Sequence, residues 1–261
     1  MFDADGRWVT TTERRGGLDQ DLAGEDRATQ LAILRKRMNA VTGRVDAADA
    51  AGVPALDVLT VPGPLGALLP AGGLVRGTTV GCTRGSVLTA LVAAATAAGK
   101  SAAIVGGARF GFLAAHEMGA RLDRLFHVRN PGPDALSIVS TLADDLDMVV
   151  LDLDELTTTP SQVRPVQATV RNKKCVWVVV TSGRVRGIRP DLQVTARPIG
   201  YSGLDTGRGL LREIHLEVRV SERAGPSHTA HLNLRGDGTG VHWIEVDQHS
   251  PEARPRLHRT G

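Results

Sequence analysis

The chain has 261 residues, of which 42% are hydrophobic and 3% aromatic, and its formal net charge is +3 at pH 7. This length suits one sizeable α/β domain with an extra element, or two small domains, with a core of Ala, Val, Leu and Ile. Cys82 and Cys175 have no C-x-x-C spacing, which excludes a disulfide framework and a cysteine zinc site. No secretory signal is visible, and the longest apolar run, Leu88 to Ala98, is shorter than the ~20 residues of a membrane helix. These features predict a soluble cytoplasmic protein.

Residues 1–54 are predicted to stand apart from the main domain. Residues 1–24 are polar and rich in Gly and Asp, which is typical of a flexible segment. From Glu25 to Thr42 the apolar residues follow 3-4-3 spacing and predict an amphipathic helix with a stripe of Leu31, Leu34, Met38 and Val41. Residues 43–54 are interpreted as a linker, so the stripe can dock on a partner or on the chain's own domain.

The main domain is expected over residues 55–249. Continuous Val-rich runs alternate with helical stretches, which is typical of a parallel sheet covered on both faces. The expected strands are Thr78–Gly81, Ser101–Val105, Met148–Asp152 and Cys175–Thr181. The expected helices are Val87–Ala98, Leu113–Gly119, Asp134–Asp145 and one within Leu156–Lys174.

After Pro198 the sequence changes to alternation of apolar and polar residues. The segments Glu213–Val220, His228–Leu234 and Gly240–Val246 predict an antiparallel meander appended to the parallel sheet. Residues 250–261 form a Pro- and Arg-rich tail that is expected to be disordered. The predicted fold class is therefore α/β, with a mostly parallel central sheet covered by helices, antiparallel carboxy-terminal strands and an amino-terminal helix.

A glycine-rich turn lies between the first expected strand and the first helix of this domain. A phosphate-binding loop of the form G-x-x-x-x-G-K-[ST] uses its backbone amides and lysine for phosphates and its hydroxyl for Mg²⁺. Here Gly81 and Gly85 are one residue too close, and Ser86 and Val87 stand where Lys and Ser/Thr belong. Because one charge-assisted hydrogen bond contributes roughly 1.5–3 kcal/mol, these losses predict that no nucleotide cofactor and no metal is bound.

Two interpretations of the turn are open. Arg84 could replace the missing lysine as a phosphate cation, since guanidinium suits phosphate geometry. The favoured alternative is a tight strand-to-helix turn in which Gly81 and Gly85 supply permissive backbone angles.

Charge is distributed unevenly along the domain. Residues 134–155 contain seven acidic residues and no Lys or Arg, whereas residues 160–200 contain eight basic residues against Asp191 alone. Such asymmetry bears on partners more than on fold. The basic block, residues 160–200, can bind DNA phosphates, bind an acidic partner surface or simply face solvent. The arginines considered for DNA are Arg184, Arg186, Arg189 and Arg197.

Four segments resemble RecA, in the same order along the chain. Leu65–Gly77 is similar to the approach to its P-loop, and Ala97–Ala102 is similar to the entry to its next strand. Met118–Phe126 resembles a later segment, and Asp147–Asp152 resembles its Walker B strand. The likeness spans about residues 56–246.

The departures from RecA concern its active site. No carboxylate lies in Ile104–Arg109, where RecA carries the residue that activates water, and Thr181-Ser182 stands in place of its Asn-Gln pair. Asp152 alone remains of the metal site and is interpreted as a capping or loop-bonding residue. The resemblance thus implies a RecA-like body without ATP chemistry, and we predict that the chain is not an enzyme.

The whole pattern is similar to ImuA-type proteins, especially the actinobacterial ImuA′ group of accessory factors in damage-induced mutagenesis. The resemblance implies a non-catalytic adaptor, cytoplasmic and associated with the nucleoid after DNA damage. Its implied partner is ImuB, a Y-family polymerase homologue without catalytic residues, and through ImuB an error-prone C-family DNA polymerase. Docking through the Leu31–Val41 stripe, self-association, and contact of the four arginines with single-stranded or primer-template DNA are further expectations. A divergent ATPase or recombinase and a SulA-like cell-division inhibitor are the alternatives.

Overall fold

The computed structural model describes residues 56–182, 184–205 and 208–245, which belong to one compact unit beginning at Leu56. The predicted amino-terminal helix with its stripe, the linker after it and the tail at 250–261 lie outside the described residues. The strands are β1 (Val58–Leu59), β2 (Leu74–Val75), β3 (Thr79–Cys82), β4 (Ala102–Gly106), β5 (Leu125–Val128), β6 (Met148–Asp152), β7 (Glu155–Thr157), β8 (Val176–Val180), β9 (Arg184–Arg186), β10 (Leu192–Asp205), β11 (Arg208–Glu222), β12 (Ser227–Gly236) and β13 (Val241–Glu245).

Helices and short 3-10 turns connect these strands. The helices are α2 (Gly63–Gly66), α3 (Ser86–Ala97), α4 (Phe112–Glu117), α5 (Ala135–Ala143) and α6 (Pro160–Asn172), and the 3-10 turns are η1 (Leu122–Arg124) and η2 (Gly132–Asp134). Among the helices of the described residues, none has the length and apolar character needed to cross a membrane.

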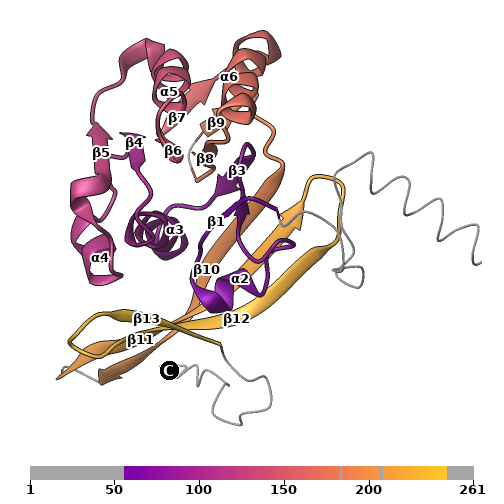
Figure 1. The fold of residues 1–261 in the computed structure, drawn as a ribbon. Coiled ribbons are helices and arrows are strands. Elements are labelled where there is room, and N and C mark those ends of the chain that lie inside the picture. Colours follow the sequence, from indigo (N-terminus) through magenta and orange to yellow (C-terminus); the bar gives the residue numbers. More distant parts are fainter. Residues whose placement is uncertain (1–55, 183, 206–207, 246–261) are drawn as a thin grey trace, which may run out of the picture. The chain divides into compact units, whose positions relative to one another are not determined.

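Nine strands of the described chain form one sheet, in the order β13-β12-β11-β10-β3-β8-β6-β4-β5 (Figure 1). Neighbouring strands from β10 through β3, β8, β6 and β4 to β5 are parallel. The pairs from β10 to β13 are antiparallel. The protein is therefore α/β with a large mixed sheet. The turns that follow β3, β4, β6 and β8 all leave the same edge of the sheet, the carboxyl edge of its parallel strands.

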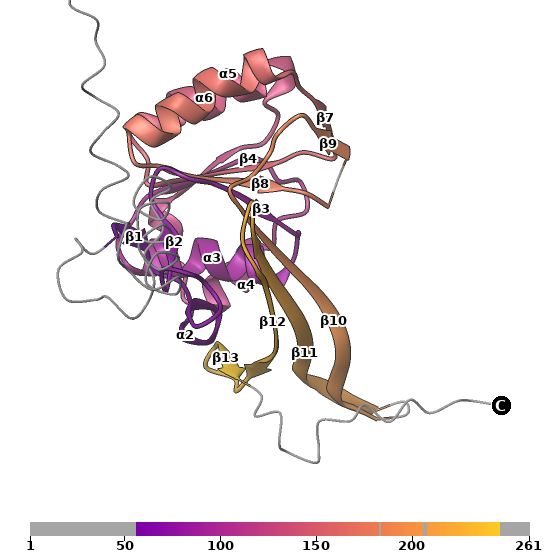
Figure 2. The ribbon, with the colours of Figure 1, turned by 90° about the vertical axis from the view of Figure 1, so that its right-hand side faces the viewer.

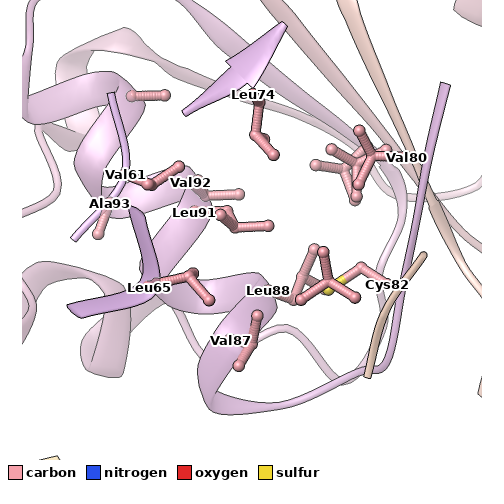
Figure 3. Packing of buried hydrophobic residues seen from close by; sticks show 14 of the residues in the cluster. Val61, Leu65, Leu74, Val80, Cys82, Val87, Leu88, Leu91, Val92 and Ala93 are labelled. Carbon is pink, nitrogen blue, oxygen red and sulfur yellow. The ribbon is translucent and has the colours of Figure 1, made fainter. Parts of the chain in front are cut away.

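The central strands β4, β6 and β8 are buried along their whole length because side chains pack on both faces. Successive residues of a strand point to opposite faces, so Val178 and Val179 belong to two different core clusters. The first cluster includes most of the apolar residues of α3, and Figure 3 shows Leu88 beside Cys82 of β3. The second cluster surrounds Trp177 and includes buried residues of α5 and α6.

The helix expected within Leu156–Lys174 is α6, and its sequence accounts for where it begins. The backbone N–H of Thr159 donates to Gln162 Oε1 at 2.9 Å, which is a capping-box contact. Pro160 occupies the first helical position, where its missing N–H costs nothing. The buried residues Val163, Val166 and Val170 are spaced by three and four, so that they form one face against the sheet.

Strand β10 is the main difference from the sequence-based expectation, which placed no strand between residues 181 and 213. It pairs with β11 from Leu192 opposite Glu222 onward. The pairing register shifts between Pro198 and Gly200 and again between Ser202 and Leu204. Pattern analysis depends on regular alternation, so these interruptions hide a long strand from it.

We expect Leu91→Ala in α3 to lower the free energy of unfolding by about 2–5 kcal/mol, because Leu91 is fully buried in the first core cluster. Leu113→Ala in α4 is the matched control, since 71% of Leu113 is exposed, and we expect it to stay within about 0.5 kcal/mol. Urea denaturation followed by circular dichroism measures both. Similar losses in the two variants would contradict this packing.

Candidate functional site

The glycine-rich turn joins the end of β3 to the start of α3 at the carboxyl edge of the sheet. Gly85 has a φ of 118°, a backbone conformation that favours glycine because a side chain would be strained there. Gly81 has another reason to be glycine, since a Cβ at this position would collide with the side chain of Gln193 on β10. The expectation that both glycines supply permissive backbone angles therefore applies to Gly85 and is wrong for Gly81.

The two positions that carry phosphate and metal chemistry in a P-loop have other roles here. Ser86 is the first residue of α3, and Val87 is 1% exposed and packs in the first core cluster. The described residues hold no group of three or more His, Cys, Asp or Glu side chains arranged for a metal ion. Cys82 and Cys175 are free and buried, and burial raises the pKa of each thiol to about 12.

Arg84, in the middle of the turn, is bound by Asp152 at the end of β6. Arg84 Nε lies 3.1 Å from Asp152 Oδ1 and 3.2 Å from Oδ2, and Nη2 lies 2.5 Å from Oδ1. The Asp152 side chain is 0% exposed and that of Arg84 is 18% exposed. The hydrogen bond from Arg84 to Asp152 raises the pKa of the guanidinium. Because a buried carboxylate needs a partner, this cation neutralises Asp152, and a phosphate would have to compete with Asp152 for it.

Asp154 extends the ion pair toward solvent. It accepts a hydrogen bond from Arg84 Nη2 at 3.1 Å and another from Arg109 Nη2. Arg109, and after it Arg84, hold the pKa of Asp154 below its ordinary value of 3.8. A depressed carboxyl pKa contributes stability above the ordinary value, and this contribution is lost as the pH falls through the folded-state pKa. Both Arg109 and Asp154 are exposed, so this outer pair is weaker than the inner one.

Backbone amides of the turn also donate hydrogen bonds to other groups of the protein. The Arg84 N–H donates to Ser182 Oγ at 2.7 Å, and the Thr83 N–H donates to the Val194 carbonyl at 3.2 Å. In a P-loop such amides face phosphate oxygens. Sequence reasoning noted Ser182 only as a departure from RecA and missed this contact. The available signal was its position directly after β8, the strand that pairs with β3.

The four arginines of the basic block do not share one environment. Arg197 on β10 is paired with Glu217 on β11, with Nε 2.8 Å from Oε1 and Nη2 3.0 Å from Oε2. Arg186 and Arg189 are exposed, and their side chains have no hydrogen bond or ion pair within the described ranges. Arg184 is the first residue of β9. Of these four arginines, Arg186 and Arg189 are thus the exposed cations whose charge no acidic side chain of the described chain neutralises.

The segments that follow β6 and β8 pair with each other. Strands β7 and β9 form a parallel ladder from Glu155 opposite Arg184 to Thr157 opposite Arg186. The ladder is extended by Thr158, whose N–H and Oγ1 donate to the Arg186 carbonyl at 3.0 and 2.9 Å. These segments are therefore held together as a small two-stranded sheet.

The fold and this site together define an α/β protein with a large mixed sheet, whose phosphate-loop-like turn is closed by an internal ion pair. The family described as MT3502 N-terminal domain matches residues 67–187, a stretch that contains the turn, Asp152, Asp154 and Ser182. The chain is 36% identical over 189 residues to "Uncharacterized protein Rv3395c" of Mycobacterium tuberculosis. The aligned region covers 71% of this chain and 85% of the relative. The chain belongs to the family of this mycobacterial protein.

We expect Arg84→Ala to lower the free energy of unfolding by about 2–4 kcal/mol, because it leaves the buried Asp152 carboxylate without its partner. Arg109→Ala, which removes only the exposed contact to Asp154, is expected to cost much less. Thermal and urea denaturation measure both effects.

The double variant Arg84→Met, Asp152→Leu tests the same interaction from the other side. Replacing both partners by apolar residues removes the unpaired charge, so it should recover most of the stability lost in Arg84→Ala. Equal stability of Arg84→Ala and Arg109→Ala would mean that the inner pair contributes little.

Proposed function

We propose that this protein is an adaptor with a RecA-like body that carries out no ATP chemistry, belonging to the ImuA′ type of damage-induced mutagenesis factors. Support for the RecA-like body comes from the order of the four similar segments along the chain. Further support comes from the placement of the glycine-rich turn at the carboxyl edge of parallel strands, where α/β folds bind ligands. The body is then a scaffold whose useful surfaces lie away from the former nucleotide site.

The observation that carries this proposal is the Arg84–Asp152 ion pair. A Mg·ATP in this place would need the guanidinium to leave a fully buried carboxylate, which would then face the phosphates as a like charge. Val87 is in the core, and the Arg84 amide is bound to Ser182, so neither replaces the lost ligands. The turn is stable as it stands, and its chemistry serves the fold.

The partners follow from the resemblance to ImuA-type proteins. ImuB is the proposed direct partner, and an error-prone C-family polymerase is reached through it. The stripe of Leu31, Leu34, Met38 and Val41 is proposed to dock on the partner. The basic block is proposed to bind DNA phosphates, and Arg186 and Arg189 are its best-supported residues. Localisation at the nucleoid after DNA damage is part of the same proposal.

We expect isothermal titration calorimetry with Mg·ATP to give no binding heat at ligand concentrations up to about 1 mM. A Kd of about 1 mM corresponds to a binding free energy of roughly −4 kcal/mol. The physical reason is the occupied Arg84 and the missing lysine and hydroxyl. Micromolar binding, or turnover of ATP, would instead favour the alternative of a divergent ATPase.

Affinity capture from DNA-damaged cells tests the adaptor role. The wild-type chain should retain ImuB, and the variant Leu34→Glu, Met38→Glu should lose about tenfold or more of it, since two charges replace the apolar stripe. Lys36→Glu, on another face of the same predicted helix, is the matched control and should retain ImuB. Retention of the cell-division protein FtsZ instead of ImuB would favour the SulA-like alternative. If the double variant unfolds, the stripe packs on its own domain and is not a docking surface.

A further inference from the structure

Three polar residues form a hydrogen-bonded chain across the outer face of the antiparallel strands. Ser202 Oγ on β10 lies 2.6 Å from His215 Nε2 on β11, and His215 Nδ1 lies 2.8 Å from Asn233 Oδ1 on β12. All three are half-buried. Their neighbours Leu216 and Leu232 point to the opposite face and into the core. Helices α2, α3 and α4 lie on that core side of the strands (Figure 2), so the three polar residues lie on the face that these helices do not cover.

The contacts of Asn233 determine which nitrogen of His215 carries the proton. Asn233 Nδ2 donates to Glu213 Oε2 at 3.4 Å, and Glu213 Oε1 in turn accepts from Arg235 Nε at 2.5 Å. With its amide nitrogen directed at a carboxylate, Asn233 presents its oxygen to His215. This arrangement favours the tautomer in which Nδ1 of His215 donates, which leaves the Nε2 lone pair to accept the proton of the Ser202 hydroxyl.

The backbone of β10 is irregular on both sides of the serine. The pairing register with β11 shifts before Gly200 and again after Ser202, at Gly203, whose φ is 90°. β-Bulges re-aim side chains and are frequent beside active sites. Gly200 stands opposite His215, and a Cβ there would lie 3.2 Å from the ring at Cδ2, so glycine leaves room for the imidazole. The sheet is thus shaped around the contact between Ser202 and His215.

We propose that Ser202, His215 and Asn233 form a nucleophilic serine site that reacts with activated carboxylic esters and organophosphorus compounds. Ser202 Oγ attacks the carbonyl carbon while its proton passes to His215 Nε2, and a bond between Oγ and carbon forms. The bond to the leaving alkoxide then breaks, and the alkoxide takes the proton from Nε2. Water then attacks the acyl carbon while its proton passes to Nε2. The bond between Oγ and carbon breaks, Oγ takes the proton from Nε2, and the carboxylic acid leaves. Asn233 and Glu213 are positioning residues that hold the imidazole in the required tautomer.

A fluorophosphonate probe tests this site in the full-length protein, because it reports a nucleophilic serine through loss of fluoride and formation of an Oγ–P bond. Mass spectrometry should map the adduct to Ser202. Ser202→Ala should abolish labelling, and His215→Gln should slow it about tenfold or more. Ser227→Ala, an exposed serine at the start of β12, is the matched control and should be labelled like the wild type.

A cysteine replacement gives a second readout that does not depend on the stability of Ser202→Ala. Ser202→Cys should react with iodoacetamide at neutral pH about tenfold or more faster than Ser227→Cys, since His215 accepts the thiol proton. The native thiols give little background because both are buried. Asn233→Leu in the Ser202→Cys protein should remove this advantage if Asn233 sets the tautomer. Absence of an adduct at Ser202 together with equal cysteine reactivity would overturn the proposal and make the three residues a structural tie between strands.

Discussion

The ion pair between Arg84 and Asp152 is the interaction on which the interpretation of this protein depends. Asp152 ends a strand whose residues are all buried, and its side chain has no exposed surface. A carboxylate in that position is stable only with a cation and hydrogen bonds around it. Arg84 supplies both from the turn after β3, and so connects two strands that are separated in the sheet by β8. The same pair occupies the place in which phosphate and metal would have to bind.

Several smaller features follow from this closed turn. Ser182 accepts the Arg84 N–H, and Asp154 accepts the outer nitrogen of the guanidinium. Gly85 allows the chain to reverse into α3, while Val87 extends the core instead of the site. A turn of this kind keeps the architecture of a ligand-binding edge but uses its polar groups internally. Function is then to be sought on surfaces, which is why the proposed adaptor role and the serine site of β10 both lie elsewhere.

The parallel part of the sheet was predictable because a strand that is buried on both faces has a continuous run of apolar residues in the sequence. Met148–Asp152 was expected as a strand and is β6 with the same bounds, and the neighbouring runs were placed to within a few residues. Strand β10 was not predictable by alternation, since its bulges at Pro198–Gly200 and at Gly203 shift the side chains between faces. Recognising a strand by alternation requires a regular apolar–polar pattern, and β10 lacks one.

The candidate site was only partly predictable, for a different reason. The residues that depart from a P-loop, Ser86 and Val87, can be read directly from the motif. Arg84 and Asp152 are 68 residues apart, and their contact follows only from knowing that β3 and β6 end at the same edge. Sequence reasoning therefore named Arg84 only as the alternative phosphate cation beside the favoured tight turn. It interpreted Asp152 as a capping or loop-bonding residue and did not pair the two. Likewise, the sequence placed Arg197 with the other arginines of the basic block. In the structure it differs from them because it is paired with Glu217 on the neighbouring strand.

The central claim is that Arg84 is held by Asp152 and is not available to a nucleotide. The most direct measurement is nuclear magnetic resonance of the Arg84 Nε–Hε group, assigned with the Arg84→Lys variant, while Mg·ATP is added. If Asp152 holds Arg84, we expect a signal whose proton is protected from exchange with water and whose position does not change over the titration. A signal that exchanges freely, or that shifts in a saturable manner with Mg·ATP, would contradict it.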